Sequence, residues 1–449
     1  MRKQVLYVIS ILMIASMILA ACAPAPAETA APAPTEAAAP TKAAAPTEAP
    51  VATEEPMATE EPMATEEPVA AECTDAIGCL DIAPGDPVHI AYLLVVAGPN
   101  ETLGIDSRNG IEIAIEDAGG EIMGHPIKFD GEDGGCSAEG GQSAGTKLAA
   151  DPTIVGVIGT SCSSEARVAA PLLSSAGFVI VSPSNTAPDL TEAGNANNYA
   201  GYLRTAHNDQ VQGAVAAEYA FNELGVTRAA TIHDGSLYAD KLQQVFAENF
   251  TALGGTITGQ EAVDPAQTDM SAVLASIAAV PPELIYLPIF MPAGGFIIRQ
   301  AKQTPGLENT ALMGADGLFS PDLVEAAGDD VEGFKVSSPL TTGEPYDTFV
   351  AKYNAKFGTT APISIFHAHA YDAFNLIKAA IEASAVQDAD GTLHIGRQAL
   401  RDAIFATSAF PGLTGSLTCT PTGDCADPNI AVYEYHAGEY PPTVIWPTQ

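Results

Sequence analysis

Basic residues are scarce in this 449-residue sequence. It contains 18 Lys and Arg against 55 Asp and Glu, which gives a formal net charge of -37. A nucleic-acid partner requires positive charge to neutralise its phosphates, so this balance argues against nucleic acid. Strong negative charge favours a soluble surface with few non-specific contacts. The charge says little about a small-molecule ligand.

Signatures of catalysis and of metal binding are also missing. Residues 159–163 lack the second glycine of a G-x-S-x-G nucleophile elbow. Residues 141–147 do not form a phosphate-binding P-loop, because the lysine does not follow a glycine. His367 and His369 are two residues apart, so on a helix they would face different ways and make a poor metal site. We therefore expect a binding protein rather than an enzyme, with no catalytic residue, cofactor or metal.

The N-terminus has the layout of a signal peptide. Arg2 and Lys3 precede an apolar run over residues 5–21, and Cys22 with a Pro-rich stretch follows at once. A membrane-spanning helix is the alternative, but the tract beyond the run carries no cationic stop-transfer cluster. Residues 19–22, Leu-Ala-Ala-Cys, resemble a bacterial lipobox. We expect residues 1–21 to be removed and Cys22 to be lipidated, because two or three acyl chains anchor a protein without any spanning helix.

Residues 23–71 consist mainly of Ala, Pro, Thr and Glu, with an imperfect repeat at 53–58 and 59–64. The segment has nine Glu and one Lys, so its charges repel one another. Such a composition buries too little apolar surface to offset the entropy of ordering. We therefore predict that residues 22–71 form the lipid anchor and a disordered, extended tether. The protein should sit on the outer side of a bacterial membrane, attached through the lipid only.

The cysteine content agrees with export. Besides Cys22, the sequence has six cysteines, which allow 15 pairings that sequence alone does not resolve. Two close pairs favour local bridges, which leaves the other two cysteines for each other. The three pairs are Cys73 with Cys79, Cys419 with Cys425, and Cys136 with Cys162. A zinc site is the competing interpretation, but none of the spacings is C-x2-C and the compartment is oxidising.

The remaining ~375 residues suit two lobes of ordinary domain size. From Pro87 onward, short apolar runs alternate with longer Ala-rich segments, and the pattern restarts after Arg204. This rhythm indicates an α/β fold with two doubly wound parallel sheets. Strands are predicted at 89–96, 126–130, 154–159, 178–182, 229–233, near Ile257 and Ile285, and at 311–314. Helices are predicted at 105–118, 144–150, 211–224, 237–253, 294–303, 321–327, 346–357 and 365–384, with a final hairpin at 418–435 that is closed by the last cysteine pair.

Three polar loops follow predicted strands, where open α/β sheets bind their ligands. The first, residues 160–165, opens a helix and offers hydroxyls and backbone N–H groups to an anion; a plain helix cap is the alternative. The second, residues 182–188, supplies further hydroxyls. The third contains Asp316 between Gly314 and Gly317, either as a turn residue or as the counter-ion of a ligand ammonium. Two anion-binding loops opposite one acid would suit a zwitterion.

These loops carry a resemblance to a known family. Residues 86–440 resemble the periplasmic leucine/isoleucine/valine-binding proteins of ATP-driven branched-chain amino-acid importers. The most telling stretches are 158–164, 182–190, 233–234 with Tyr238, 298–301 and 313–317. The resemblance implies a type I periplasmic binding protein, in which two lobes are joined by a hinge that the chain crosses three times, near residues 206, 337 and 415. Lobe 1 would hold residues 72–206 and 338–414, and lobe 2 would hold 207–337 and 415–449.

The resemblance also implies roles for individual residues. Ser163 and Thr186 would bind a ligand carboxylate, while the Ser184 carbonyl, Thr186 and Asp316 would receive the ammonium. Tyr238 would close over the cleft from the second lobe, and the family's disulfide in the first lobe falls on Cys136 and Cys162. The sequence departs from the family pattern at three positions: Leu103 replaces an aromatic residue, Phe290 a tyrosine, and Asp316 a glutamate. The three suggested pocket residues are Leu103, Phe290 and Phe366, although core packing is a competing explanation for Phe366.

The expected function is that of a substrate-binding lipoprotein that presents an aliphatic amino acid to the permease of an ABC importer. Within binding proteins, the alternative is a receptor for an amide, urea or aromatic acid on the same fold, because one scaffold hosts many sites. A sensory ligand-binding protein is the alternative from a different class. The lipobox without a transmembrane helix disfavours a sensor that signals through its own chain.

Overall fold

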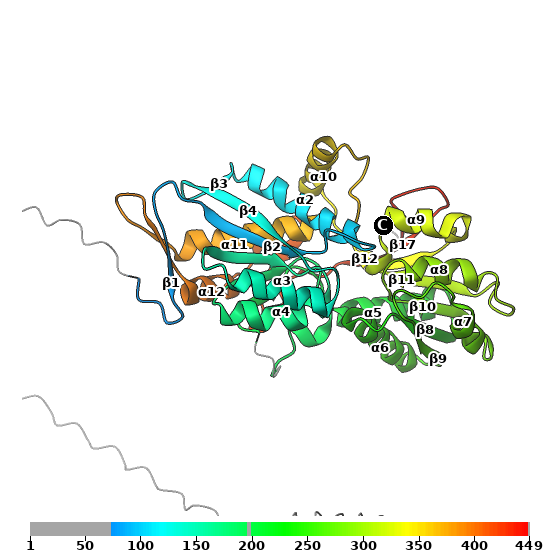
Figure 1. Cartoon of the computed structure of the whole chain (residues 1–449). Helices are drawn as coiled ribbons and strands as arrows, with labels where there is room; N and C mark the ends of the chain where they lie inside the picture. The colour runs from blue at the N-terminus through cyan, green and yellow to red at the C-terminus, as the bar shows by residue number, and fades with distance from the viewer. Residues whose placement is uncertain (1–72, 195–198, 448–449) are drawn as a thin grey trace, which may run out of the picture. The chain divides into compact units, whose positions relative to one another are not determined.

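The computed structural model describes residues 73–194 and 199–447. These residues form two main β-sheets, each covered by helices (Figure 1). The predicted signal peptide, the lipidation site Cys22 and the whole predicted tether lie outside the described residues. In the described part of the chain, no helix combines the length and apolar character needed to span a membrane.

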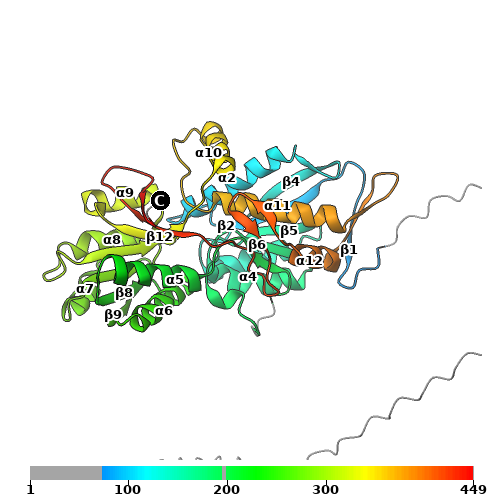
Figure 2. The ribbon, with the colours of Figure 1, turned by 180° about the vertical axis from the view of Figure 1, so that it is seen from behind.

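The first sheet has six strands in the order β3-β4-β2-β5-β6-β7, all parallel except β3 with β4. Alternate residues of β2 enter two different cores: Ile90 and Leu94 pack toward α2 and α11, whereas Ala91 and Leu93 pack toward α3 and α4. Helices therefore cover both faces (Figures 1 and 2). The elements are β2 (Val88–Leu94), α2 (Glu101–Asp117), β3 (Glu121–Ile122), β4 (His125–Asp133), α3 (Ala138–Ala149), β5 (Ile154–Gly159), α4 (Ser163–Ser175), β6 (Val179–Ser182), η1 (Pro188–Leu190), β7 (Tyr202–Arg204), α10 (Glu344–Phe357) and α11 (His367–Ser384).

The second sheet has seven strands in the order β18-β17-β12-β11-β10-β8-β9, of which β17 and β18 are antiparallel to their neighbours. In β10, Leu284 and Tyr286 share a core with α6, and Ile285 and Leu287 share the opposite core with α7 and α8. The elements are α5 (Asp209–Glu218), η2 (Tyr219–Glu223), β8 (Arg228–His233), α6 (Leu237–Ala252), β9 (Thr256–Ala262), α7 (Ser271–Ala278), β10 (Leu284–Leu287), α8 (Ala293–Ala301), β11 (Ala311–Ala315), η3 (Asp316–Leu318), α9 (Pro321–Ala327), η4 (Gly328–Val331), β12 (Lys335–Pro339), β17 (Ile430–Glu434) and β18 (Thr443–Trp446). The predicted α/β class with two doubly wound sheets is confirmed.

The chain passes between the two sheets three times, as a three-crossing hinge requires. The first two connections follow β7 and β12, close to the predicted positions. The third lies later than the predicted crossing near residue 415, because Leu417 and Cys425 still pack in a core of the first sheet. The chain joins the second sheet only at Ile430, the first residue of β17.

The end of the chain corrects further predictions. The predicted hairpin over residues 418–435 is wrong, since β17 pairs with β12 and β18 instead. A smaller hairpin forms earlier, from β15 (Phe410–Gly412) and β16 (Gly415–Leu417). A three-stranded sheet in the order β1-β14-β13 and helix α12 (Arg397–Phe405) were not predicted, and neither was α7. The strands of that sheet are β1 (Cys79–Ile82), β13 (Val386–Gln387) and β14 (Leu393–Gly396), so it pairs segments more than 300 residues apart, which no local pattern signals.

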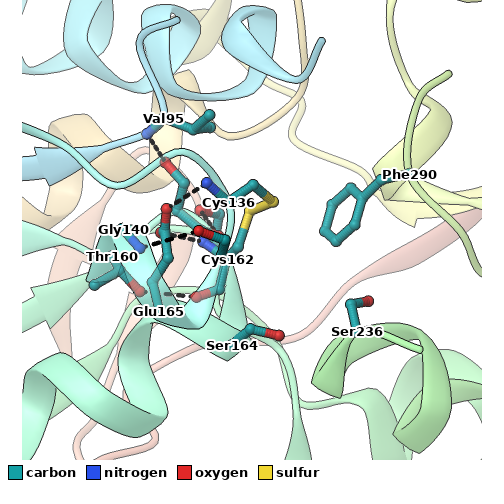
Figure 3. The surroundings of a disulfide bond; sticks show 12 residues. Val95, Cys136, Gly140, Thr160, Cys162, Ser164, Glu165, Ser236 and Phe290 are labelled. Atoms are coloured by element: carbon teal, nitrogen blue, oxygen red, sulfur yellow. Dashed lines mark hydrogen bonds between the residues drawn. A yellow bond between two sulfur atoms is a disulfide. The ribbon is translucent and has the colours of Figure 1, made fainter. Parts of the chain in front are cut away.

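Three disulfides are present, with the pairing that the spacing favoured: Cys73–Cys79, Cys136–Cys162 and Cys419–Cys425. Figure 3 shows the surroundings of the second bridge. It joins the segment before α3 to Cys162, the residue immediately before α4. The bridge therefore ties the loop after β4 to the loop that opens α4.

Removing this bridge is expected to destabilise the fold. A Cys136→Ser/Cys162→Ser variant should lose roughly 3 kcal/mol of unfolding free energy, because the bridge closes a loop across 26 residues. Urea unfolding followed by circular dichroism measures this change. The matched control is Cys419→Ser/Cys425→Ser, whose bridge spans only 6 residues and constrains the unfolded chain less. Recovery of Cys136 and Cys162 as free thiols in peptide mapping without reduction would contradict the bridge.

Candidate functional site

The polar loops predicted from sequence meet at the carboxyl ends of the strands. β5 ends at Gly159, whose φ of 144° is outside the range that other residues adopt readily. A Cβ at this position would also lie 2.2 Å from the carbonyl oxygen of Leu93 in the neighbouring strand. Only glycine lets the chain turn here into the loop that opens α4. The second loop leaves the adjacent strand β6, and the third leaves β11 of the other sheet.

Side-chain hydrogen bonds join the first two loops. Ser163, the first residue of α4, accepts a bond from the Ala187 N–H at 3.3 Å. The Ser184 hydroxyl donates to the Ser161 carbonyl at 2.9 Å, and the Ser161 hydroxyl accepts from the Val95 N–H at 3.0 Å. Ser163 and Thr186 are almost fully buried. The structure thus brings the predicted carboxylate-binding residues together at a helix N-terminus, where backbone N–H groups and the helix dipole favour an anion.

A buried acid holds the N-terminus of α4 in place. Glu165 accepts the N–H groups of Cys136 at 2.7 Å and Cys162 at 2.9 Å (Figure 3). Its side chain is fully buried, and this burial raises its pKa to about 7. The sequence analysis missed this role, although a Glu three residues after the N-cap, here Cys162, is a common capping residue. Glu165 and the disulfide together fix the loop that carries Ser163.

The third loop places Asp316 in a buried network of the second sheet. Gln212 of α5 donates to Asp316 Oδ1 at 2.5 Å and to the Ser337 carbonyl at 2.9 Å. The Tyr238 hydroxyl donates to the same Asp316 oxygen at 3.3 Å and accepts from the Gly317 N–H at 3.2 Å. Burial raises the pKa of Asp316 to about 6, against the hydrogen bonds from Gln212 and Tyr238 that lower it. Asp316 is therefore more than a turn residue, because side chains of α5 and α6 both donate to it.

The predicted apolar residues belong to one cluster. Leu103, Phe290, Phe366 and Tyr238 all lie in the core cluster that includes the Cys136–Cys162 bridge. Leu103, Phe290 and Asp316 also line one small cavity. The Tyr238 and Phe290 rings are 4.9 Å apart between centroids. Figure 3 shows Phe290 beside the disulfide, opposite the Glu165 carboxylate.

Phe366 is placed differently from the other apolar candidates. It is not among the residues that line that cavity, and its ring packs against His207 and His369, with centroids 6.3 and 5.4 Å away. Burial lowers the pKa of His207 to about 4 and that of His369 to about 3, so both imidazoles are neutral. Phe366 therefore supports the site from the hinge side, in line with the packing explanation.

The two histidines considered as metal ligands have separate structural partners. His367 bonds to Asp106 at 2.9 Å and to the Tyr346 hydroxyl at 2.9 Å, which fastens α10 and α11 to α2. His369 packs on Phe366. Within residues 73–194 and 199–447, no group of three potential ligands is suited to a metal ion.

Loops of the two sheets touch around the site. The Leu237 N–H donates to the Ser164 hydroxyl at 3.0 Å, and the Thr102 and Ser320 hydroxyls are 3.2 Å apart. The Ser364 hydroxyl donates to the Phe319 carbonyl at 3.2 Å. Ser164 and Thr102 lie in the first turns of α4 and α2, and Ser364 precedes α11, so all three belong to the first sheet. Their partners belong to the second sheet. The candidate residues therefore lie between the two sheets, in contact with both.

Comparison with known proteins places this arrangement in a family. The profile of the periplasmic binding protein family matches residues 87–439. The chain belongs to that family. Among relatives, Leu/Ile/Val-binding protein BraC3 of Rhizobium johnstonii is 28% identical over 78% of this chain and 92% of its own length. A Pseudomonas aeruginosa protein that binds leucine, isoleucine, valine, threonine and alanine is 26% identical over 78% of this chain and 90% of its own.

Solved structures of periplasmic binding proteins share the fold. A leucine-binding protein from Thermotoga maritima aligns with a TM-score of 0.71 at 25% identity, over 80% of this chain and 99% of its own. A Streptococcus pneumoniae protein in complex with isoleucine aligns with a TM-score of 0.69 at 21% identity, over 80% and 99%. A solute-binding protein from R. palustris in complex with benzoate has a TM-score of 0.68 at 20% identity, over 80% and 95%. The predicted type I periplasmic binding protein fold is therefore confirmed.

Sequence reasoning missed three residues that organise the site: Arg204, Asp209 and Gln212. Arg204 is fully buried and donates to the Asn185 and Ala187 carbonyls at 3.1 and 2.9 Å, which fixes the second loop. Asp209 and Gln212 are on α5, which begins just after the predicted hinge crossing near residue 206. A run of polar residues directly after a predicted crossing was the available signal, and it was not used.

Proposed function

We propose that this periplasmic binding protein captures an aliphatic amino acid between its two lobes and delivers it to an ABC importer. One observation carries the proposal: hydroxyls at the N-terminus of α4 come from the first sheet, and the buried Asp316 follows β11 of the second sheet. A helix N-terminus favours a carboxylate, and a buried acid favours a cation. An α-amino acid carries both charges on adjacent carbons.

The ligand contacts follow from this placement. We assign the ligand carboxylate to Ser163 and Thr186, and the ammonium to Asp316, Thr186 and the Ser184 carbonyl. Tyr238, which donates to Asp316 from α6, covers the ammonium from the second lobe. The aliphatic side chain contacts Leu103 and Phe290, which share a cavity with Asp316.

Delivery to a membrane is proposed from the N-terminal sequence. The lipobox at residues 19–22 favours an extracytoplasmic protein anchored through lipid at Cys22, with the segment up to residue 71 as tether. The relatives named Leu/Ile/Val-binding protein support an amino-acid cargo. The partner is then an importer permease. We also propose that lobe 1 consists of the first sheet with its helices and lobe 2 of the second sheet with its helices.

Titration calorimetry tests the ligand class. Leucine, isoleucine, valine and alanine are expected to bind, whereas their amides and the matching keto acids should bind far more weakly, because each lacks one of the two charges. If a keto acid or benzoate bound as tightly as the amino acids, the site would be a receptor for organic acids. If the amides bound best, the amide alternative would replace the amino acid.

Ligand binding is expected to close the lobes. A ligand that contacts loops of both lobes binds the closed state better than the open state, and therefore shifts the population toward closure. Small-angle scattering should give a smaller radius of gyration with saturating leucine than without it. A radius that stays unchanged at saturation would count against hinge closure.

A further inference from the structure

Asp209, the first residue of α5, is a buried acid that the assigned ligand contacts do not use. Its side chain is 0% exposed, and its carboxylate accepts a side-chain hydrogen bond from Thr186 but belongs to none of the ion pairs in the described part of the chain. The Thr186 hydroxyl, already assigned to the ligand, is buried as well. The backbone places them together, because the Asp209 N–H donates to the Thr186 carbonyl at 2.9 Å. A buried carboxylate is normally paired with a cation, so an acid held by one hydroxyl points to a cationic ligand.

Helix capping does not explain Asp209. An acid in the first turn stabilises a helix by interacting with its free N–H groups and its dipole. In α5 the side chain that caps the helix is Asn208, whose Oδ1 accepts the Gln210 N–H at 3.0 Å. A buried carboxylate without a cation beside it costs several kcal/mol, which a structural role alone does not recover.

Asp209 lies beside Asp316. Gln212, three residues further along α5, donates to Asp316 at 2.5 Å, and positions three apart on a helix share a face. Burial raises the pKa of Asp209 well above its usual range, and the negative charge of Asp316 raises it further.

Other ionisable groups face the two acids from neighbouring elements. The Arg204 guanidinium at the end of β7 lowers the pKa of Asp209, but by less than burial raises it. His207 precedes α5 and is kept neutral by burial. The phenols of Tyr238 in α6 and Tyr286 in β10 have pKa values raised by burial, so both remain neutral donors. Arg204 is already engaged by Asp424 at 2.5 Å, which leaves the two acids without a dedicated cation.

We propose that Asp209 and Asp316 share one proton in the free protein and that a ligand ammonium displaces it. The inference rests on the proposed function, because it assigns both acids to the ammonium subsite. In the free protein, one carboxylic acid and one carboxylate hold a single negative charge. The ammonium arrives already protonated, the shared proton leaves to solvent, and two carboxylates then face one ammonium and the Thr186 hydroxyl. No covalent bond to carbon or nitrogen forms or breaks.

Binding then depends on pH in a defined direction. The free protein holds the shared proton below the upper pKa of the pair, and the complex does not. Affinity for an amino acid should therefore rise with pH up to that pKa, by at most about tenfold per pH unit, and level off above it. Asp316 has its pKa raised to about 6, so the rise should be measurable around that pH.

Two measurements test the pair. The first is carbon-13 NMR of the aspartate carboxyls in the free protein, with Asp316→Asn and Asp209→Asn to assign the signals. Asp372 is the internal reference, because burial also raises its pKa to about 6, while it binds the backbone of residues 413 and 414 away from the site. The second is calorimetry with leucine, isoleucine, valine and alanine in buffers of different ionisation enthalpy, which counts protons released per ligand.

The expected results test the shared proton separately from the identity of the ligand. In the free wild type, two carboxyls should titrate in coupled steps, and Asp209→Asn should lower the pKa of Asp316. Wild type should release up to one proton per ligand near pH 6, whereas Asp209→Asn should release almost none. Asp209→Asn should also bind the amino acids at least tenfold more weakly than wild type at pH 8. The control Asp372→Asn should behave like wild type in both measurements. Independent titration of the two acids would overturn the inference even if amino acids bind, and so would binding without proton release. A coupled pair in a protein that binds none of the four amino acids would uphold the pair and refute the proposed cargo.

Discussion

Replacing Asp316 with alanine is expected to reduce amino-acid affinity by at least about a hundredfold. The ligand ammonium would be buried without its counter-ion, and removing one partner of a buried charge pair costs about 3 to 5 kcal/mol. Since each 1.4 kcal/mol corresponds to a factor of ten in affinity, a hundredfold loss is a lower bound. Asp316→Asn should also be severe, because the amide keeps the shape and loses the charge. Titration calorimetry with leucine, isoleucine, valine and alanine measures the loss.

The matched control is an exposed acid of the same lobe. Asp329 in η4 is exposed and away from the site, so Asp329→Ala should leave affinity unchanged. Urea unfolding of both variants separates lost binding from lost stability. If Asp316→Ala left amino-acid binding intact, the amino-acid assignment would fail, and an amide, urea or aromatic acid would become the better ligand class.

Replacing Arg204 with methionine is expected to lower the free energy of unfolding by roughly 3 kcal/mol and to weaken ligand binding as well. The guanidinium is fully buried, bonds to Asp424 at 2.5 Å, and donates to the Thr191 hydroxyl at 2.7 Å and to two loop carbonyls. Methionine fills similar space but leaves those buried acceptors unpaired, which costs the desolvation of each. Because the same loop carries Thr186, its loosening should also reduce affinity.

A surface arginine provides the control for Arg204. The Arg228 side chain is 51% exposed and pairs with Glu283 only at 3.8 Å, so Arg228→Met should cost less than about 1 kcal/mol. Arg204→Lys should fall between the two, because an ammonium replaces the charge but not the forked set of donors. Chemical unfolding and leucine titration of all three variants test this order. Equal losses for Arg204→Met and Arg228→Met would show that the buried contacts of Arg204 are not stabilising.

The accuracy of the sequence predictions depended on the range of the interactions involved. β5 and β10 are short runs of buried apolar residues, and α9 begins with Pro321 after the capping Ser320, so neighbouring residues define them. Strand β17 was assigned to the wrong hairpin because its first partner, β12, lies about 90 residues earlier. The sheet of β1, β13 and β14 was missed for the same reason.

The site shows the same division between local pattern and tertiary structure. By itself, the sequence determined the alternation of strands and helices, and hence the strand ends at which Ser163, Thr186 and Asp316 lie, because these signals come from adjacent residues. Only the tertiary structure decided that Gln212 reaches Asp316, that Arg204 holds the second loop, and that Asp209 is fully buried. Burial and charge pairing depend on elements far apart in the chain. The sequence therefore does not show whether a given carboxylate is solvated or buried.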